Sequence, residues 1–212
     1  PYGRQQVLRF SPHTRAVLEL RSRRDLEILE KIYANSVLLG DDGPDGWGIQ
    51  YAREFDMTND SRLFPPRPKW EEKGYRPDEY GRWLLGGWRA REAGSPAPPD
   101  APRWGLQPGV ILSRDGSEWI HESEVRDTAL PLYQGVMIHQ FDHAYKEWVS
   151  GTGLNARWEF VPWTHKIPQP QFLIASDNVP HPHAVLKVGF RDIARTTDER
   201  TLLSALIPGL PC

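Results

Sequence analysis

Proline is the residue that most limits what this chain can fold into, because 20 of its 212 residues are prolines. A proline fixes its own backbone angle and lacks the N–H group that a helix interior or a central strand needs. Between the prolines, short extended runs outnumber helical ones. We therefore expect an α+β fold, with a mixed, largely antiparallel sheet of short strands, a few helices, and long loops rich in proline and tryptophan.

The overall composition is that of a folded protein. Hydrophobic residues make up 39% of the chain and charged residues 25%, which is too apolar for a disordered segment. The length favours one domain, and because the chain starts without methionine we expect residues 1–212 to be a fragment of a larger protein. A formal net charge of −2 gives no general attraction to nucleic acid. Any DNA contact would have to come from a local basic patch or from a partner domain.

The cysteine content and the hydropathy pattern indicate where the protein works. Cys212 is the only cysteine, which excludes a disulfide within the chain and a cysteine-rich zinc site. No run approaches the ~18 apolar residues that a membrane span needs, and the N-terminus lacks the apolar core of a signal peptide. We expect a cytoplasmic protein.

The stretch FRDIARTTDERTLLSALIP, residues Phe190–Pro208, combines charge with a clear structural pattern. It continues an extended run, Ala184–Arg195, in which successive side chains alternate between two faces. One face carries the basic residues Lys187, Arg191 and Arg195.

After this strand we expect a short helix that ends at Pro208. Thr196 and Glu199 have the spacing of a capping box, in which both side chains satisfy free backbone N–H groups. The apolar stripe of the helix would consist of Leu202, Leu203, Leu206 and Ile207. A helix N-terminus beside a basic strand favours an anion such as phosphate. The alternative is an ordinary strand–helix unit, whose arginines pair with neighbouring carboxylates.

Other elements are predicted from local periodicity and turn residues. Ser22, with Asp25 three residues on, predicts a helix from about Arg23 to Asn35. The turn residues Asp115-Gly116 predict a hairpin between two short strands. The predicted strands are Val7–Phe10, Trp47–Phe55, Val110–Leu112, Glu118–Ile120, one within Leu130–Gln140, Trp158–Val161 and Gln171–Ile174.

The segment Pro65–Trp104 has no sustained periodicity, and we interpret it as an irregular excursion or insertion with a short helix around Pro77–Leu85. Loops of this length are usually functional. Basic and aromatic residues alternate in it, a mixture that can bind phosphate and stack on bases but is also typical of protein interfaces. These residues are Arg67, Lys69, Trp70, Arg76, Trp83, Trp88, Arg89 and Arg91.

Two patterns could hold a metal ion. His139 and His143 stand four residues apart, but their segment is predicted to be extended, where such residues lie far from each other, so a structural role is favoured. Asp45, Glu71 and Lys73 formally match the PD…ExK pattern of metal-dependent nucleases, which holds Mg²⁺ and positions water. Both halves of that pattern lie in irregular segments. We expect neither a metal site nor catalytic residues in the chain.

Three separated stretches resemble bacterial adenine-specific DNA methyltransferases of restriction–modification systems. They are EFDMTNDSRLF (Glu54–Phe64), PLYQGVMIHQFDH (Pro131–His143) and FRDIARTTDERTLLSALIP (Phe190–Pro208). More closely, they are similar to the part that follows the methylase domain in type IIG-like enzymes, which fuse cleavage, methylation and recognition. The resemblance covers most of Arg9–Cys212 and leaves Pro65–Trp104 unmatched.

The resemblance implies a DNA target-recognition region, which holds duplex DNA for base flipping and N6-adenine methylation by an upstream catalytic domain. The NPPY-type catalytic loop and the glycine-bearing motif for S-adenosylmethionine are not in this chain. The sequence Asn-Val-Pro-His at residues 178–181 does not replace NPPY. The fragment would therefore be non-catalytic and without a cofactor, and the parent enzyme would use S-adenosylmethionine, with Mg²⁺ as a further candidate. Its partners would be double-stranded DNA and the methyltransferase domain of the same polypeptide, and not a membrane.

The same resemblance places Arg191, Arg195 and Arg200 near phosphate, at the domain junction or in a fold-holding role. Base reading is expected from loops that differ from those of relatives, within Pro65–Trp104. The full set of DNA-binding candidates is Arg191, Arg195, Arg200, Lys187, Lys69, Arg76, Arg89, Arg91 and Asn59. The alternatives are a metal-dependent nuclease that uses Asp45, Glu71 and Lys73, or a scaffold of the same enzyme that does not read DNA.

Overall fold

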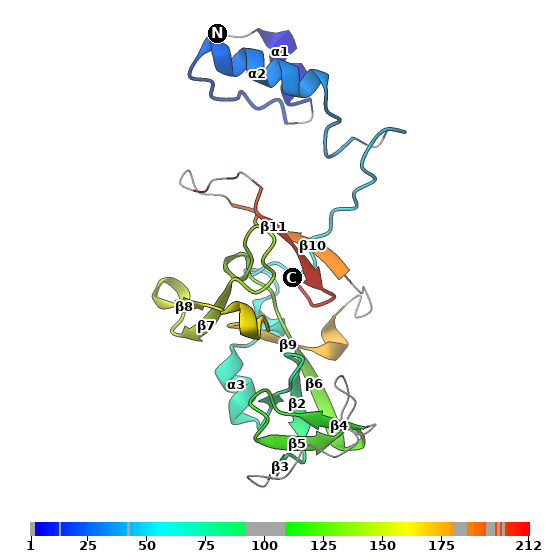
Figure 1. Ribbon diagram of the computed structural model, residues 1–212, viewed down its shortest axis with the longest axis vertical. Coiled ribbons are helices and arrows are strands. Elements are labelled where there is room, and N and C mark those ends of the chain that lie inside the picture. Colours follow the sequence, from blue (N-terminus) through cyan, green and yellow to red (C-terminus); the bar gives the residue numbers. More distant parts are fainter. Residues whose placement is uncertain are drawn as a thin grey trace. The chain divides into compact units, whose positions relative to one another are not determined.

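The computed structural model describes residues 3–12, 14–41, 43–91, 109–179, 186–193, 198, 200 and 202–212 (Figure 1). The chain was treated above as one recognition-type domain. By its contacts it divides into two compact units, Pro1–Ala52 and Arg53–Cys212. Short helices and several small antiparallel sheets make up the described residues, so the α+β class is confirmed.

The first unit contains helices α1 (Arg4–Phe10) and α2 (Arg23–Ala34). The predicted α2 is confirmed together with its cap, since the Asp25 N–H donates to Ser22 Oγ at 3.2 Å and the Ser22 N–H donates to Asp25 Oδ2 at 2.8 Å. The Phe10 and Tyr33 rings lie 4.9 Å apart, and the Tyr33 hydroxyl donates to the Phe10 carbonyl. These contacts hold the two helices against each other.

Two strands predicted in the first unit are wrong. Residues 7–10 belong to α1, which begins where the Gly3 N–H donates to Gln6 Oε1 at 2.8 Å. Residues 47–51 form no strand, and Trp47 and Tyr51 are 69% and 66% exposed. Alternation alone does not make a strand, because the backbone also needs a hydrogen-bonded neighbour.

The second unit is built from small antiparallel sheets. A sheet of four strands has the order β1 (Arg76–Pro77), β2 (Trp83–Gly86), β6 (Val125–Pro131), β9 (Leu173–Ala175). A second sheet has the order β3 (Arg89–Ala90), β5 (Glu118–His121), β4 (Val110–Leu112). The two remaining pairs are β7 (Lys146–Ser150) with β8 (Arg157–Phe160), and β10 (Leu186–Phe190) with β11 (Ser204–Pro208). Short 3₁₀ turns link the strands at Ser61–Leu63, Glu122–Glu124, Gly135–Met137, Gly153–Asn155, Trp163–His165 and Ser176–Asn178.

Several of these strands match the sequence. The hairpin around Asp115-Gly116 is confirmed as β4 and β5, and the strands predicted near residues 158 and 171 correspond to β8 and β9. The strand predicted within 130–140 is wrong over most of that range. Strand β6 ends at Pro131, and Gly135–Met137 forms a 3₁₀ turn.

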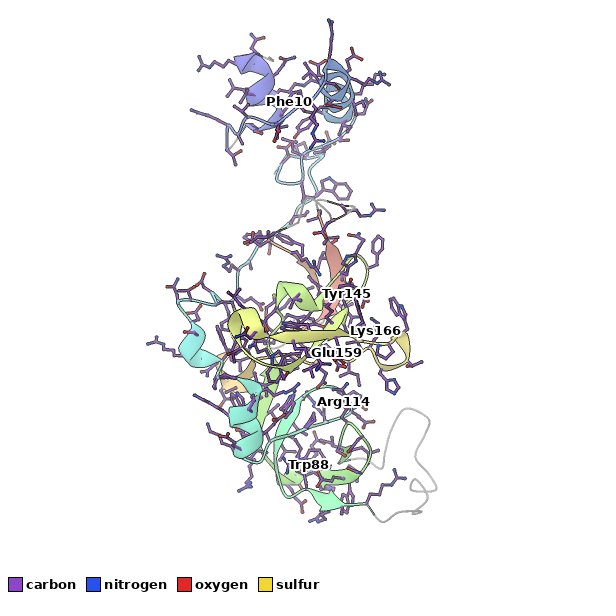
Figure 2. The ribbon with its side chains drawn as sticks, turned by 90° about the vertical axis from the view of Figure 1, so that its left-hand side faces the viewer. Phe10, Trp88, Arg114, Tyr145, Glu159 and Lys166 are labelled. Carbon is purple, nitrogen blue, oxygen red and sulfur yellow. The ribbon has the colours of Figure 1, made fainter. Side chains whose placement is uncertain are left out.

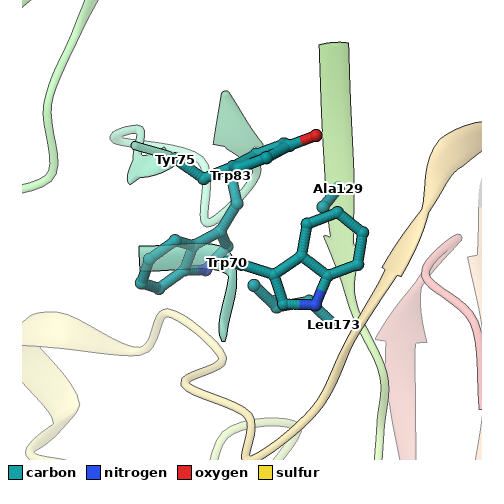
Figure 3. Close-up of a cluster of buried hydrophobic side chains, with 5 residues drawn as sticks. All are labelled: Trp70, Tyr75, Trp83, Ala129 and Leu173. Atoms are coloured by element: carbon teal, nitrogen blue, oxygen red, sulfur yellow. The ribbon is translucent and has the colours of Figure 1, made fainter. Parts of the chain in front are cut away.

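The interpretation of residues 65–104 as an irregular excursion is wrong for residues 65–91. This part holds helix α3 (Arg67–Glu72) and strands β1, β2 and β3, and the predicted helix around 77–85 is replaced by a turn and β2. Its aromatic residues form the main core cluster of the four-stranded sheet (Figure 3). The members of that cluster are Trp70, Tyr75, Trp83, Ala129 and Leu173. Residues 92–108 lie outside the described part of the chain.

The predicted helix before Pro208 is also wrong, because Ser204–Pro208 is strand β11 and pairs antiparallel with β10 (Figure 1). Leu203, Ala205 and Ile207 are buried, whereas Leu202 and Leu206 are exposed, which is the alternation of a strand. The predicted cap residues Thr196 and Glu199 lie outside the described residues.

The face of β10 that is turned inward is not the apolar one. Leu186, Val188 and Phe190 are exposed, while Lys187 and Gly189 face Ile207 and Ala205 of β11. A Cβ at Gly189 would lie 3.0 Å from Ile207 Cδ1, so glycine gives Ile207 room to pack. The ammonium group of Lys187, which lies on the inward face, therefore needs a counter-charge within the fold.

In the part of the chain that the structure describes, no helix is long and apolar enough to cross a membrane.

Candidate nucleic-acid interface

A tight turn at residues 139–142 projects an aromatic side chain from the second unit. The His139 N–H donates to the Asp142 carbonyl at 2.9 Å, and the Asp142 N–H donates back to the His139 carbonyl at 3.0 Å. Between them Phe141 has φ +61°, and its side chain is 80% exposed. The Phe141 N–H donates to the Ser204 carbonyl at 2.8 Å, which ties the turn to β11.

Beside this turn, the rings of His139, Tyr145 and Phe160 contact one another in that order. His139 stacks on Tyr145 with ring centres 4.5 Å apart, and Tyr145 meets Phe160 edge-on at 5.1 Å. Lys146 Nζ lies 4.7 Å from the Phe160 ring centre and 5.6 Å from that of Tyr145. Because Lys146 pairs with Phe160 across β7 and β8, the sheet itself sets this cation against the ring.

Arg191 supports the same region from the end of β10. Its Nε–H donates to the carbonyl oxygens of Gly135 and Ile138, at 2.9 Å each, so it fixes both ends of the 3₁₀ turn that precedes His139. The guanidinium also lies 5.9 Å from the Tyr145 ring centre. Neither Nη group makes a hydrogen bond or ion pair with another described residue.

An ion pair between Asp142 and Lys166 fixes the turn to the rest of the second unit. Lys166 Nζ donates to Asp142 Oδ2 at 2.7 Å and to the Ala144 carbonyl at 3.0 Å, and both charged side chains are 11% exposed. The Lys166 ammonium also lies 4.4 Å from the ring centre of Trp163. His143 Nε2 is 3.0 Å from the Lys166 carbonyl, a contact in which the ring nitrogen donates. Tyr145 and Lys166 can be located in Figure 2.

We define the turn surface by three exposed aromatic residues and three cations that adjoin their rings or the turn itself. The aromatic side chains of Phe141, Phe160 and Trp163 are 80%, 65% and 75% exposed. The cations are Lys146, Lys166 and Arg191. Exposed rings beside cations can stack on bases while the charges approach phosphate, which is how many proteins bind nucleic acid.

The three stretches that carry the sequence resemblance contact one another here. Phe64 of the first stretch shares a buried core cluster with Leu132 of the second, Phe141 of the second bonds to Ser204 of the third, and Arg191 of the third bonds back to the second. The three stretches, far apart in the sequence, are thus connected, and the second and third meet at the turn.

Lys187, one of the predicted DNA-binding residues, is largely buried in an ion pair within the fold. Its Nζ lies 2.5 Å from Glu54 Oε1 and donates to the Leu210 carbonyl at 3.2 Å, with side-chain exposures of 17% for Lys187 and 11% for Glu54. Glu54 Oε2 accepts from the Cys212 N–H at 3.1 Å. Burial, reinforced by Glu54, raises the pKa of the Cys212 thiol.

The predicted base-reading arginines lie on or beside the small sheets, and Arg76 lines a pocket together with His165. Arg76 is 3.8 Å from Glu118, and Arg89 is 2.5 Å from Glu124 while its guanidinium covers Trp119 at 4.8 Å. The Arg91 N–H donates to the Ser117 carbonyl. Arg76 and Arg89 make local ion pairs, which lowers their surplus charge for phosphate.

The remaining candidates are dispersed. Lys69 is exposed on α3, Arg200 is exposed, and Asn59 is exposed in a turn where its N–H donates to Asp56 Oδ1. Arg195 lies outside the described residues. Of the eight candidates that the structure describes, only Arg191 belongs to the turn surface.

Neither metal pattern is assembled within the described residues, in which no group of three or more His, Cys, Asp or Glu side chains could hold a metal ion. Glu71 pairs with Arg67 at 3.3 Å, and Lys73 lies over the Trp70 ring. Asp45 belongs to the first compact unit and the other two residues to the second.

Sequence reasoning missed five residues of the turn surface: Phe141, Lys146, Phe160, Trp163 and Lys166. The alternation in Lys146–Ser150 and Arg157–Phe160 is a local signal for a hairpin with one exposed face, and it could have placed Lys146 beside Phe160. No comparable signal places Lys166, because its partner Asp142 is fixed by tertiary structure.

Comparison of the chain with models of known protein families, with curated proteins and with solved structures finds no match.

Proposed function

We propose that the chain is the DNA target-recognition region of a restriction–modification adenine methyltransferase and that it holds duplex DNA against the turn surface. The observation that carries the proposal is the cluster of exposed rings and cations at Phe141, Phe160, Trp163 and their neighbours. The contacts that connect the three stretches resembling this enzyme class give further support.

The turn surface offers DNA two kinds of contact, cations for phosphates and aromatic faces for bases or sugars. Lys146 is held over an exposed ring and is suited to a phosphate, which positions the duplex without reading its sequence. Phe160 and Trp163 offer flat apolar faces to bases or sugars. Arg191 holds the segment before the turn through Nε, and its guanidinium lies beside the Tyr145 ring.

In this proposal the chemistry belongs to an upstream methyltransferase domain of the same polypeptide, which binds S-adenosylmethionine, in a cytoplasmic enzyme. Adenine must leave the base stack to be methylated, so the recognition region has to hold a deformed duplex.

The test is the affinity of the protein for a random-sequence duplex of about 30 base pairs, measured by fluorescence anisotropy over a range of salt concentrations. A protein that neutralises phosphates loses affinity as salt rises, with a slope of about 0.9 per phosphate on logarithmic axes. We expect Lys146→Gln to reduce the slope by about one phosphate, and Phe160→Ala to weaken binding at an unchanged slope.

The matched control is Lys69→Gln, which removes an exposed lysine on α3 outside the turn surface. It should leave both affinity and slope unchanged. Absence of salt-sensitive binding by the unaltered protein would contradict the proposal. If Lys69→Gln and Lys146→Gln changed the affinity and the salt slope equally, DNA binding would not depend on the turn surface, and that part of the proposal would be wrong.

One observation favours a second candidate, a scaffold role in the same enzyme. Leu186, Val188 and Leu206 form an exposed apolar face on β10 and β11, a type of surface that commonly contacts protein. A scaffold that does not read DNA would lose assembly with the methyltransferase domain after Val188→Asp and would show no base preference in selection from a random duplex pool. Selection of a defined sequence would exclude it.

A further inference from the structure

Phe141 occupies a backbone conformation that does not suit it. Its φ of +61° lies in the left-handed region, where a Cβ crowds the backbone and where glycine or asparagine is usual. A bulky side chain at positive φ is a true outlier, and such strain is found most often at functional positions. In a turn of this kind glycine would relieve the strain at once.

The ring of Phe141 gains little from the rest of the described chain. It is 80% exposed, whereas Met137 and Ile138, which precede the turn, are almost fully buried in a core cluster. Neither the backbone nor the core therefore accounts for phenylalanine at this position. The benefit must come from something that the ring contacts outside the described residues.

The turn nevertheless holds the ring in a fixed place. Two backbone hydrogen bonds close it, a third ties it to Ser204, and the Gln140 side chain accepts from the Ser204 N–H at 3.3 Å. Asp142, 8% exposed, accepts from the Ala144 N–H at 3.1 Å and from Lys166. An exposed aromatic ring on a rigid support loses little conformational entropy when it binds.

The shape and charge around the ring favour nucleic acid over protein as the partner. Phe141 is flanked along the chain by the polar residues Gln140 and Asp142, and both are less exposed than the ring. Lys166, whose charge is paired with Asp142, supports the turn, and Arg191 supports the segment before it. Apolar side chains that project from a protein surface are the wedges that some DNA-binding proteins insert between neighbouring base pairs.

We propose that Phe141 is a wedge that inserts into the base stack of bound duplex DNA where a base pair is opened. The inference rests on the proposed function and adds to it the residue that occupies the gap. Insertion of the ring replaces the stacking that the duplex loses when a base leaves the helix. In this proposal, the positive φ of Phe141 is the conformation that points its ring outward from a turn closed by two backbone hydrogen bonds.

The test compares two duplexes of about 30 base pairs that differ only in one central abasic site. A missing base leaves a gap that a wedge can fill without first unstacking the DNA. We expect the unaltered protein to bind the abasic duplex about tenfold more tightly than the intact one. Phe141→Gly should bind both duplexes equally, while Phe141→Trp should retain the preference.

Phe141→Gly is chosen because it separates folding from function. Glycine accepts φ +61°, so we expect the midpoint of thermal unfolding to stay the same or to rise. The matched control is Leu154→Ala, which removes another fully exposed apolar side chain outside the turn and should leave the preference intact.

The possible failures are distinguishable. If the unaltered protein binds neither duplex, the proposed function fails and the wedge fails with it. If the protein binds both duplexes equally, or if Phe141→Gly keeps the tenfold preference, DNA binding stands and the wedge is wrong.

Discussion

Lys187 Nζ lies 2.5 Å from Glu54 Oε1, across 133 residues of sequence, and the two side chains are almost fully enclosed. The pair ties strand β10 to the first residues of the second unit, and Glu54 also receives the Cys212 N–H. A basic residue that the sequence favours for DNA contact thus holds the fold together.

Removal of the Lys187 charge should destabilise the protein. Lys187→Met leaves Glu54 buried without its cation, and we expect the free energy of unfolding to fall by about 3 kcal/mol. Urea denaturation monitored by tryptophan fluorescence measures this change. Lys69→Met is the exposed control and should change the free energy by less than about 0.5 kcal/mol.

The double variant Lys187→Met with Glu54→Leu removes both charges and should recover part of the loss. If Lys187→Met weakened DNA binding while its stability stayed unchanged, the structural role of this lysine would be wrong.

Arg191 should be sensitive even to a conservative change. Arg191→Lys loses the Nε–H group that bonds the Gly135 and Ile138 carbonyls, and an ammonium cannot reproduce that planar geometry. We expect the free energy of unfolding to fall by about 1–2 kcal/mol. The same substitution at the exposed Arg200 is the control and should be silent. Equal stability of both variants would show that the two carbonyl contacts contribute nothing.

Asp115 should titrate at unusually low pH. Hydrogen bonds from the Ser117 hydroxyl and N–H and from the Ser113 hydroxyl lower the pKa of Asp115 to about 2. NMR titration of its side-chain carboxyl carbon measures this value directly. Ser117→Ala should raise the pKa of Asp115 more than Ser113→Ala, because the Ser117 hydroxyl is the largest cause.

The stability that Asp115 contributes follows in sign from that shift. Its pKa in the folded protein lies below its ordinary value, so the contribution is fully present above about pH 4 and is lost as the pH falls toward about 2. Acid unfolding of Ser117→Ala should show a smaller loss over this range. An Asp115 pKa near the ordinary value in the intact protein would contradict the hydrogen-bond geometry.

Local signals in the sequence predicted the elements that depend on local contacts. The cap formed by Ser22 and Asp25 starts α2, and the turn Asp115-Gly116 joins β4 to β5. Both patterns act within a few residues and need no distant partner. The α+β class follows from the same short elements.

Elements that depend on distant partners were not predictable in the same way. The run Leu202–Ile207 suits a helical stripe as well as a strand, and its pairing with Leu186–Phe190 decides for the strand. Residues 65–91 lack periodicity because they form several short elements. Trp70 on α3, Tyr75 between α3 and β1, and Trp83 on β2 pack into one small core cluster. Pairing of Arg89 with Glu124, or of Lys187 with Glu54, is likewise set by the tertiary structure.

The most direct test of the central claim is an NMR titration of the isotope-labelled protein with a random-sequence duplex of about 30 base pairs. The claim predicts that the largest shifts fall on the backbone amides of Phe141, Lys146 and Phe160 and on the indole N–H of Trp163, while Lys69, Arg76 and Arg89 shift little. The claim is contradicted if the spectrum does not respond to DNA, or if the shifts gather on α3 and on β1 to β3 instead.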